Sequence, residues 1–273
     1  MSGDLHVARK RFGQNFLHDR NIVDRIVRAI APQSGDRIIE IGPGKGALTY
    51  PLLQNIGQMR AIEIDRDLIP RLRAHAPKYG QLEIIEADVL TVDFSALATD
   101  GPIRLVGNLP YNISSPILFH ALEYAGAIRD MHFMLQKEVV DRMGATHGNK
   151  DYGRLTVMLQ SRVLVEPLFL VPPGSFTPAP KVDSAIVRLT PLPPEQIPAY
   201  SPQRLDQIVR AAFQQRRKTL RNSLSGVVST EQLQQAGIDP SLRAEQVSVA
   251  EFLKLAAGAN ELGAADDVGA ASG

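Results

Sequence analysis

The residues of this sequence best suited to chemistry are Asn108-Leu109-Pro110-Tyr111, which follow a short apolar run. The exocyclic amine of a nucleobase is a poor nucleophile, because its lone pair is delocalised into the ring. Two fixed hydrogen-bond acceptors would favour the tetrahedral geometry that attack requires. The Asn108 side-chain oxygen could be one acceptor and the Leu109 carbonyl the other, because Pro110 fixes the local backbone. Tyr111 could stack on a base flipped out of its helix. The alternative interpretation is a proline-containing turn with a buried tyrosine.

A glycine-rich turn with the sequence GPGKG, residues 42–46, follows an earlier apolar run. Glycines at such a place let the backbone turn tightly and come close to a ligand. Gly42, Gly44 and Ala47 also satisfy a loose dinucleotide-binding pattern, whereas the spacing excludes a phosphate-binding P-loop. A tight turn without any ligand is the other interpretation.

Acidic residues end the next two apolar runs. Glu63 lies 21 residues after Gly42, where a carboxylate can accept hydrogen bonds from both hydroxyls of a ribose. Asp88 follows the third run, and its carboxylate could accept a hydrogen bond from the exocyclic amine of a bound adenine. Each acid alone could be a strand-end residue facing water. Together with the glycine turn, they predict a cofactor that contains adenosine.

These residues need a parallel sheet to bring them together. Apolar runs of strand length, bounded by Gly, Pro or Asp, occur at residues 37–41, 59–64, 82–86, 103–107 and 131–136. Helix-compatible segments lie between them, a pattern that predicts βαβ units and a mostly parallel sheet. Residues 163–171 and 185–190 predict two later strands that could close the sheet as an antiparallel hairpin. Before the first strand, residues 22–30 predict a helix with Asp19 as its N-cap.

A change in composition divides the chain near residue 198. Residues 191–202 contain five prolines, which indicates a linker. We therefore expect a catalytic domain at residues 1–198, a small all-helical domain at 199–256 and a disordered tail at 257–273. Within the first domain, residues 152–162 could form a helix.

Composition limits the remaining choices. The chain has 273 residues, 44% of them hydrophobic, so it can bury a sizeable core. It has no cysteine, which excludes disulfides and cysteine-ligated zinc. We see no signal peptide and no run long enough to span a membrane, so we expect a cytoplasmic protein.

The net charge of +1 does not exclude a nucleic-acid partner, because positive charge is concentrated locally. The basic residues of two segments are Arg9, Lys10 and Arg11, and Arg210, Arg216, Arg217, Lys218 and Arg221. Residues 212–225 contain no Asp or Glu, so nearby opposite charges do not neutralise the second segment. Phosphate binding is the simplest use of both segments, and a solvated basic face is the alternative.

The sequence resembles the ribosomal RNA adenine N6-dimethyltransferases, most closely the bacterial small-subunit enzymes of the KsgA/RsmA family. The likeness runs from about residue 9 to about residue 256. Five motifs carry it in order: FGQNFL at 12–17, EIGPGKG at 40–46, NLPY at 108–111, FTPAPKVDS at 176–184 and FQQRRKTL at 213–220.

The resemblance implies a fold and a reaction. The fold is α/β, a Rossmann-like class I S-adenosylmethionine methyltransferase sheet with a small all-helical C-terminal domain. The reaction dimethylates two adjacent adenosines in the 3′-terminal hairpin loop of 16S ribosomal RNA within an assembling 30S particle, with a role in small-subunit biogenesis. No metal is expected, because the sulfonium of the cofactor already carries the positive charge. A monomer without membrane contact is expected.

The resemblance also implies roles for particular residues. S-adenosylmethionine would contact Asn15, Leu17, Gly42, Glu63, Asp88 and Asn108. Phe176 would stack on the face of the target base opposite Tyr111, and would complete a catalytic set with Asn108, Leu109, Pro110 and Tyr111. On its own chemistry, Phe176 in a proline-rich loop is equally suited to packing.

Three other functions remain open. A related enzyme methylates large-subunit ribosomal RNA and confers macrolide resistance, but the QQRRK segment at 214–218 is not expected in it. Methyltransferases of protein glutamine amides or DNA adenine use a similar motif, but the FGQNFL motif and the basic helical domain disfavour them. A ribosome-assembly factor whose binding matters more than its catalysis is the third.

Overall fold

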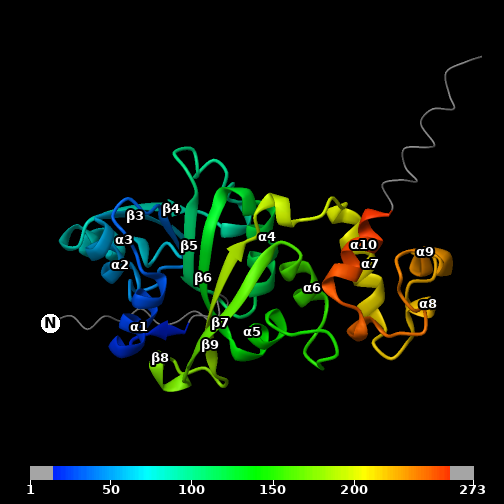
Figure 1. The fold of residues 1–273 in the computed structure, drawn as a ribbon. Helices are drawn as coiled ribbons and strands as arrows, with labels where there is room; N and C mark the ends of the chain where they lie inside the picture. The colour runs from blue at the N-terminus through cyan, green and yellow to red at the C-terminus, as the bar shows by residue number, and fades with distance from the viewer. Residues whose placement is uncertain (1–14, 259–273) are drawn as a thin grey trace, which may run out of the picture. The chain divides into compact units, whose positions relative to one another are not determined.

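The structure, a computed structural model, describes residues 15–258. Nine strands lie in these residues: β1 (Phe16–Leu17), β2 (Ile38–Ile41), β3 (Gln58–Glu63), β4 (Gln81–Glu86), β5 (Ile103–Asn108), β6 (Ile128–Gln136), β7 (Val163–Val171), β8 (Phe176–Thr177) and β9 (Ser184–Pro191). Seven of them form one sheet in the order β4-β3-β2-β5-β6-β9-β7 (Figure 1). All seven strands predicted from the sequence are present, with ends that differ by up to three residues.

The sheet is mostly parallel, as predicted. β2 pairs in parallel with β3 and β5, and these pair in parallel with β4 and β6. β9 is antiparallel to β6 and lies between β6 and β7. The carboxyl ends of β2, β3, β4 and β5 therefore meet at one edge of the sheet, which is where α/β folds bind their ligands.

Helices cover the sheet because their apolar residues recur at helical spacing. This part of the chain has α1 (Arg20–Ile30), α2 (Thr49–Ile56), α3 (Ile69–His75), α4 (Ser114–Glu123) and α5 (Lys137–Met143). α1 begins as predicted, because the Asp19 carboxylate accepts hydrogen bonds from the amides of Asn21 and Ile22. Buried side chains of α1 and α2 pack with those of β2, β5 and β6 in one hydrophobic cluster. α1 and α2 therefore cover the same face of the sheet.

A second, two-stranded sheet was not predicted. β1 pairs antiparallel with β8, with Phe16 opposite Thr177 and Leu17 opposite Phe176. Both strands have only two residues, too few to show a periodic pattern. The pairing joins the FGQNFL motif to the FTPAPKVDS motif, which are about 160 residues apart.

A second compact unit contains the C-terminal helices, and its boundary differs from the prediction. Its helices are α6 (Arg154–Gln160), α7 (Pro202–Gln214), α8 (Leu220–Ser223), α9 (Thr230–Gln235) and α10 (Val249–Ala257). Residues 141–165 belong to this unit together with the chain from Leu192 onward, whereas the sequence assigned them to the first domain. The reason is packing: Tyr152 and Val157 are buried in one cluster with Leu205 and Phe252. The tail was expected from residue 257, but Ala257 is the last residue of α10 and Gly258 is its C-cap; residues 259–273 lie outside the described residues.

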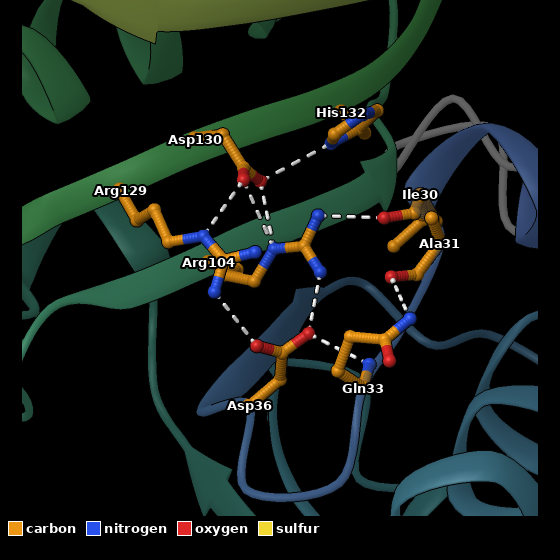
Figure 2. Close-up of polar contacts among 8 residues, drawn as sticks. All are labelled: Ile30, Ala31, Gln33, Asp36, Arg104, Arg129, Asp130 and His132. Atoms are coloured by element: carbon orange, nitrogen blue, oxygen red, sulfur yellow. Dashed lines mark hydrogen bonds and ion pairs between the residues drawn. The ribbon is translucent and has the colours of Figure 1, made fainter.

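A buried network of charges crosses the amino-terminal ends of β5 and β6 (Figure 2). The Arg104 side chain is 4% exposed, and its guanidinium donates to Asp130 at 3.0 Å and to Asp36 at 2.6 Å. A third hydrogen bond runs from Arg104 Nη2 to the carbonyl of Ile30 at 2.6 Å. Arg129 pairs with Asp36 from the surface at 2.9 Å. All three guanidinium nitrogens have a partner, the condition under which a buried arginine is tolerated.

Among residues 15–258, no helix is long and apolar enough to cross a membrane.

Candidate active site

A cavity of about 290 Å³ opens where the carboxyl ends of β2 to β5 meet. The predicted residues that line it are Asn15, Leu17, Gly42, Glu63, Asp88, Asn108, Leu109, Pro110 and Tyr111. The parallel sheet thus brings together side chains from four separate strand ends. The structure describes all of the predicted catalytic and cofactor-binding residues, and of these only Phe176 does not line the cavity.

The glycine-rich turn supplies one wall of the cavity. Gly42 and Gly44 have positive φ angles of 67° and 56°, which other residues rarely adopt. The Gly42 amide donates to the carbonyl of Ile62 at 2.9 Å, which ties the turn to β3. Gly107 on β5 is needed for another reason: a Cβ there would lie 2.5 Å from the carbonyl oxygen of Ile41. Close approach of β2 and β5 beside the cavity therefore depends on this glycine.

Glu63 is held firmly beside the glycine turn. Its side chain accepts hydrogen bonds from the Asp65 amide at 2.8 Å and from the Gly44 amide at 3.4 Å. The residue is 5% exposed. Burial raises the pKa of the Glu63 carboxyl, although these two hydrogen bonds oppose the increase.

Glu40 is a second buried acid of the cavity wall, and it was not among the predicted site residues. It is 2% exposed, and its Oε2 accepts a hydrogen bond from the Thr49 hydroxyl at 2.6 Å. Burial raises the pKa of the Glu40 carboxyl to about 7; the Thr49 hydrogen bond opposes this and the Glu63 charge adds to it. The sequence did contain a signal for a role of Glu40, because it is the one acidic residue in the otherwise apolar strand at 38–41.

We expect Glu40 to make the stability of the ligand-free protein depend on pH. The folded protein keeps this proton to about pH 7, whereas the unfolded chain loses it near the ordinary pKa of 4.5. The stabilisation is therefore complete below pH 4.5 and is lost as the pH rises to about 7, by about 3 kcal/mol. Urea unfolding of wild type and Glu40→Gln between pH 4.5 and 8 measures it.

The Glu40→Gln variant should show a flatter dependence of the free energy of unfolding on pH over that interval. Glu86→Gln is the matched control, because Glu86 ends strand β4 of the same sheet but is exposed; its profile should follow wild type. A slope in Glu40→Gln equal to that of wild type would show that Glu40 is ionised in the folded protein.

The charge of the two buried acids, Glu40 and Glu63, distinguishes between S-adenosylmethionine and a dinucleotide as the ligand of the cavity. In the described part of the chain, neither Glu40 nor Glu63 forms an ion pair with Lys or Arg. When ionised, these carboxyl groups repel the diphosphate of a dinucleotide and favour a cationic ligand, whose positive charge would in turn lower their pKa values. The chemistry of the wall therefore suits S-adenosylmethionine and disfavours the dinucleotide alternative. No group of three or more His, Asp or Glu within residues 15–258 could hold a metal ion.

The Asn108 side chain is oriented by the backbone of the FGQNFL motif. Its amide nitrogen donates to the carbonyl oxygen of Asn15 at 2.9 Å. A carbonyl can only accept, so this contact fixes which end of the amide is nitrogen. Oδ1 is left as the acceptor that Asn108 offers in the cavity.

The next two residues are held by strand β6 and by the start of helix α4. The Leu109 amide donates to the Met134 carbonyl on β6 at 3.1 Å, and the Pro110 carbonyl accepts from Ile113 at 3.2 Å. The Pro110 carbonyl is thus occupied, which favours Leu109 as the second acceptor for an amine. The Tyr111 hydroxyl lies 2.7 Å from the Ser184 hydroxyl, and burial raises the pKa of this phenol.

Two predicted residues have local roles in this structure. Asp88 is exposed, and its Oδ1 accepts from the Leu90 amide at 3.0 Å, which caps a short 3₁₀ turn at Val89–Thr91. Phe176 is 3% exposed and packs in a hydrophobic cluster with Leu17 and Val171. This is the packing alternative, and stacking of Phe176 on a base stays a prediction.

The basic residues of the C-terminal unit are not equivalent, which corrects the expectation that they lack acidic partners. Arg210 pairs with Asp206, one turn earlier on α7, at 2.9 Å. Arg216 lies 3.7 Å from Glu245, and it donates to the carbonyls of Lys150 and Tyr152 at 2.7 and 3.3 Å. These partners lie outside residues 212–225, the segment without Asp or Glu.

The remaining basic residues are exposed. Arg217, Lys218 and Arg221 have no ion pair among the described residues, although the charge of Arg221 helps to lower the pKa of Asp239. Residues 216–218 form a turn after α7 rather than a helix. The N-terminal cluster Arg9–Lys10–Arg11 lies outside the described residues.

The fold and the cavity define a class I methyltransferase that uses S-adenosylmethionine. Solved structures agree with this class. A dimethyladenosine transferase from Plasmodium falciparum superposes with a TM-score of 0.79 at 28% identity, covering 91% of this chain and 98% of the other. The 23S rRNA methyltransferase ErmE has a TM-score of 0.68 at 29% identity, covering 88% and 98%.

The chain belongs to the ribosomal RNA adenine dimethylase family, whose model matches residues 5–261. A protein named ribosomal RNA small subunit methyltransferase A from Xanthomonas campestris pv. campestris (strain 8004) is 58% identical over 249 residues, 91% of this chain and 95% of the relative. A protein of the same name from Xanthomonas oryzae pv. oryzae (strain PXO99A) is 57% identical over the same shares. The family, the fold class and the cofactor inferred from the sequence are confirmed.

Proposed function

We propose that this chain transfers methyl groups from S-adenosylmethionine to the N6 amines of two adjacent adenosines in the 3′-terminal hairpin loop of 16S ribosomal RNA, and dimethylates each. The particle would be an assembling 30S subunit in the cytoplasm, and the enzyme would act as a monomer. Relatives named as small-subunit methyltransferases are 58% identical, against 29% for ErmE, which favours the small subunit over the macrolide-resistance alternative.

The observation that carries the chemistry is the fixed orientation of Asn108. With its nitrogen bound to the Asn15 carbonyl, Oδ1 can accept one hydrogen of the target amine, and the Leu109 carbonyl can accept the other. Both acceptors favour the tetrahedral amine, whose lone pair can form the new carbon–nitrogen bond. When bound, S-adenosylmethionine supplies a methyl group on a cationic sulfur; its transfer breaks the carbon–sulfur bond, leaves a neutral thioether and makes the amine positively charged until it releases a proton to solvent. Glu40, Glu63, Asp88 and the glycine turn would hold that cofactor.

The RNA would be held by the exposed basic turn of the C-terminal unit. Arg217 and Lys218 are the best candidates for phosphate contacts, because they are exposed and have no ion pair among the described residues. Arg216 is already engaged with two carbonyls and Glu245, so it supports the turn. Arg9, Lys10 and Arg11, with Arg210 and Arg221, stay weaker candidates.

We expect replacement of Arg217 and Lys218 by Ala to weaken binding to the small subunit and to reduce its dependence on salt. Each lost phosphate contact should lower the slope of log affinity against log salt by about 0.7–0.9, so the double variant should lose up to about 2. Cofactor affinity should not change. Filter binding across a salt series measures the slope.

A matched double variant, Arg73→Ala with Lys78→Ala, removes the same charge from exposed positions of the methyltransferase unit. It should leave the slope near that of wild type. If the control lowers the slope as much as the test variant does, total charge explains the effect and the turn has no special contact with RNA.

The proposed function is tested by transfer of tritiated methyl groups to under-methylated small subunits, to large subunits and to free ribosomal RNA. We expect incorporation into small subunits well above the other two. Preferential labelling of large subunits would favour the macrolide-resistance type of enzyme. Tight binding to small subunits without any transfer would favour an assembly factor.

A further inference from the structure

A buried serine contacts the residue proposed to stack on the target base. Ser184 is fully buried, and its hydroxyl lies 2.7 Å from the Tyr111 hydroxyl. We propose that Ser184 is a positioning residue, which fixes the Tyr111 ring in the orientation that receives the adenine. The inference rests on the proposed function, because it takes Tyr111 as the platform for the base.

Tyr111 is held at both of its ends. Its carbonyl accepts a hydrogen bond from the Ser114 hydroxyl at 3.2 Å, at the first residue of α4. Its backbone also follows Pro110, which restricts the chain. A tyrosine side chain turns about two bonds, so fixing the hydroxyl at the far end of the ring removes most of the remaining freedom. A platform ordered in advance avoids the entropy that the base would otherwise lose by ordering it.

Ser184 can act as an anchor because it belongs to the sheet. It opens β9, where it lies opposite Gln136 in the antiparallel pairing with β6. The preceding residue adds a further bond, from the Lys137 amide to the Asp183 carbonyl at 2.9 Å. Its position is therefore set by backbone pairing. A phenol is protonated at neutral pH, and burial raises the pKa of Tyr111 further, so the contact joins two neutral hydroxyls.

The same proline-rich motif contacts both halves of the proposed base site. Its first residues form β8, which pairs with β1, and the Asn15 carbonyl that orients Asn108 comes just before β1. Its last residue, Ser184, meets Tyr111. This gives the FTPAPKVDS motif a function that does not require Phe176 to touch the base.

The test is a double-mutant cycle on the single-turnover rate of methyl transfer, at saturating S-adenosylmethionine and small subunits. Ser184→Ala and Tyr111→Phe should each lower the rate about 3- to 10-fold, the range for one neutral hydrogen bond. The double variant should be no slower than the slower single variant, because both remove the same bond. Affinity for S-adenosylmethionine should not change in any of them.

Ser161→Ala is the matched control. Ser161 is also buried, at 2% exposed, and its hydroxyl donates to the Met158 carbonyl in the other unit. It should keep the wild-type rate. If Ser184→Ala does not fold, Tyr111→Phe still breaks the bond from the other side without a change in β9.

The possible results distinguish failure of the positioning role of Ser184 from failure of the proposed methylation of adenine. Wild-type rates in both single variants would overturn the inference, as would a double variant slowed by the product of the single effects. Either result could occur while wild type methylates adenine and Tyr111→Ala is impaired, so the proposed function would stand. Absence of adenine methylation by wild type would overturn both.

Discussion

Replacement of Asn108 by Ala is expected to lower the single-turnover rate of methyl transfer about 100-fold or more. The variant removes the acceptor that the Asn15 carbonyl holds in place, and loss of one preorganised polar contact in a transition state costs a factor of this size. Asn108 also lines the cofactor cavity, so the rate must be measured at saturating S-adenosylmethionine. Rapid-quench measurements on under-methylated small subunits give the rate directly.

Asn55→Ala is the matched control for this variant. The Asn55 amide also donates to a backbone carbonyl, that of Pro51 at 2.7 Å, but it does so on the exposed surface of α2. Its rate should equal that of wild type. A rate within about threefold of wild type for Asn108→Ala would show that the amide does not act on the amine in the transition state.

The second large effect is expected from Arg104→Met, which removes the buried partner of Asp36 and Asp130 and leaves them only the half-exposed Arg129 (Figure 2). Methionine fills a similar volume but cannot neutralise either carboxylate. Breaking a buried pair from one side costs about 3–5 kcal/mol. The free energy of unfolding in urea should fall by that amount, with a control, Arg66→Met, that changes it by about 1 kcal/mol or less. Arg66 pairs with Glu86 but its side chain is 83% exposed.

Acid unfolding gives a second measure of the same network. Burial raises the pKa of both Asp36 and Asp130, but hydrogen bonds and the charge of Arg104 outweigh it, so both pKa values lie below the ordinary 3.8. The stabilisation is therefore present above about pH 4 and is lost as the pH falls through the lower folded values. Arg104→Met should unfold at a higher pH than wild type. An unchanged acid midpoint would mean that other groups dominate acid unfolding.

The shared edge of the sheet was predictable because it follows from topology. Parallel strands joined by right-handed crossovers place their carboxyl ends together, so Glu63, Asp88 and Asn108 had to meet if the three runs were strands. The glycine turn was predictable for a related reason, because positive φ angles at Gly42 and Gly44 need residues without a Cβ. Local pattern and simple topology were therefore sufficient to bring these residues to one cavity, although they did not find Glu40 in its wall.

The residues proposed to bind the target base are oriented by contacts with residues far away in the sequence, which a local sequence pattern cannot show. Asn108 is oriented by a carbonyl 93 residues away, and Tyr111 by a hydroxyl 73 residues away. Arg216 has no acidic residue near it in the sequence, but its guanidinium donates to the carbonyl of Lys150, which is 66 residues away. Long-range packing also assigns residues 141–165 to the C-terminal unit. Such pairings are set by the whole fold, and a single sequence shows no periodicity for them.

The most direct test of the account is the identity and position of the product nucleoside. Under-methylated small subunits are incubated with the enzyme and S-adenosylmethionine, and their 16S ribosomal RNA is then digested and analysed by mass spectrometry. We predict N6,N6-dimethyladenosine at two adjacent positions of the 3′-terminal hairpin loop. In an incubation just long enough for wild type to complete the reaction, Asn108→Ala should form almost none. Methylation of another base, of another atom of adenine or of ribosomal protein would contradict it.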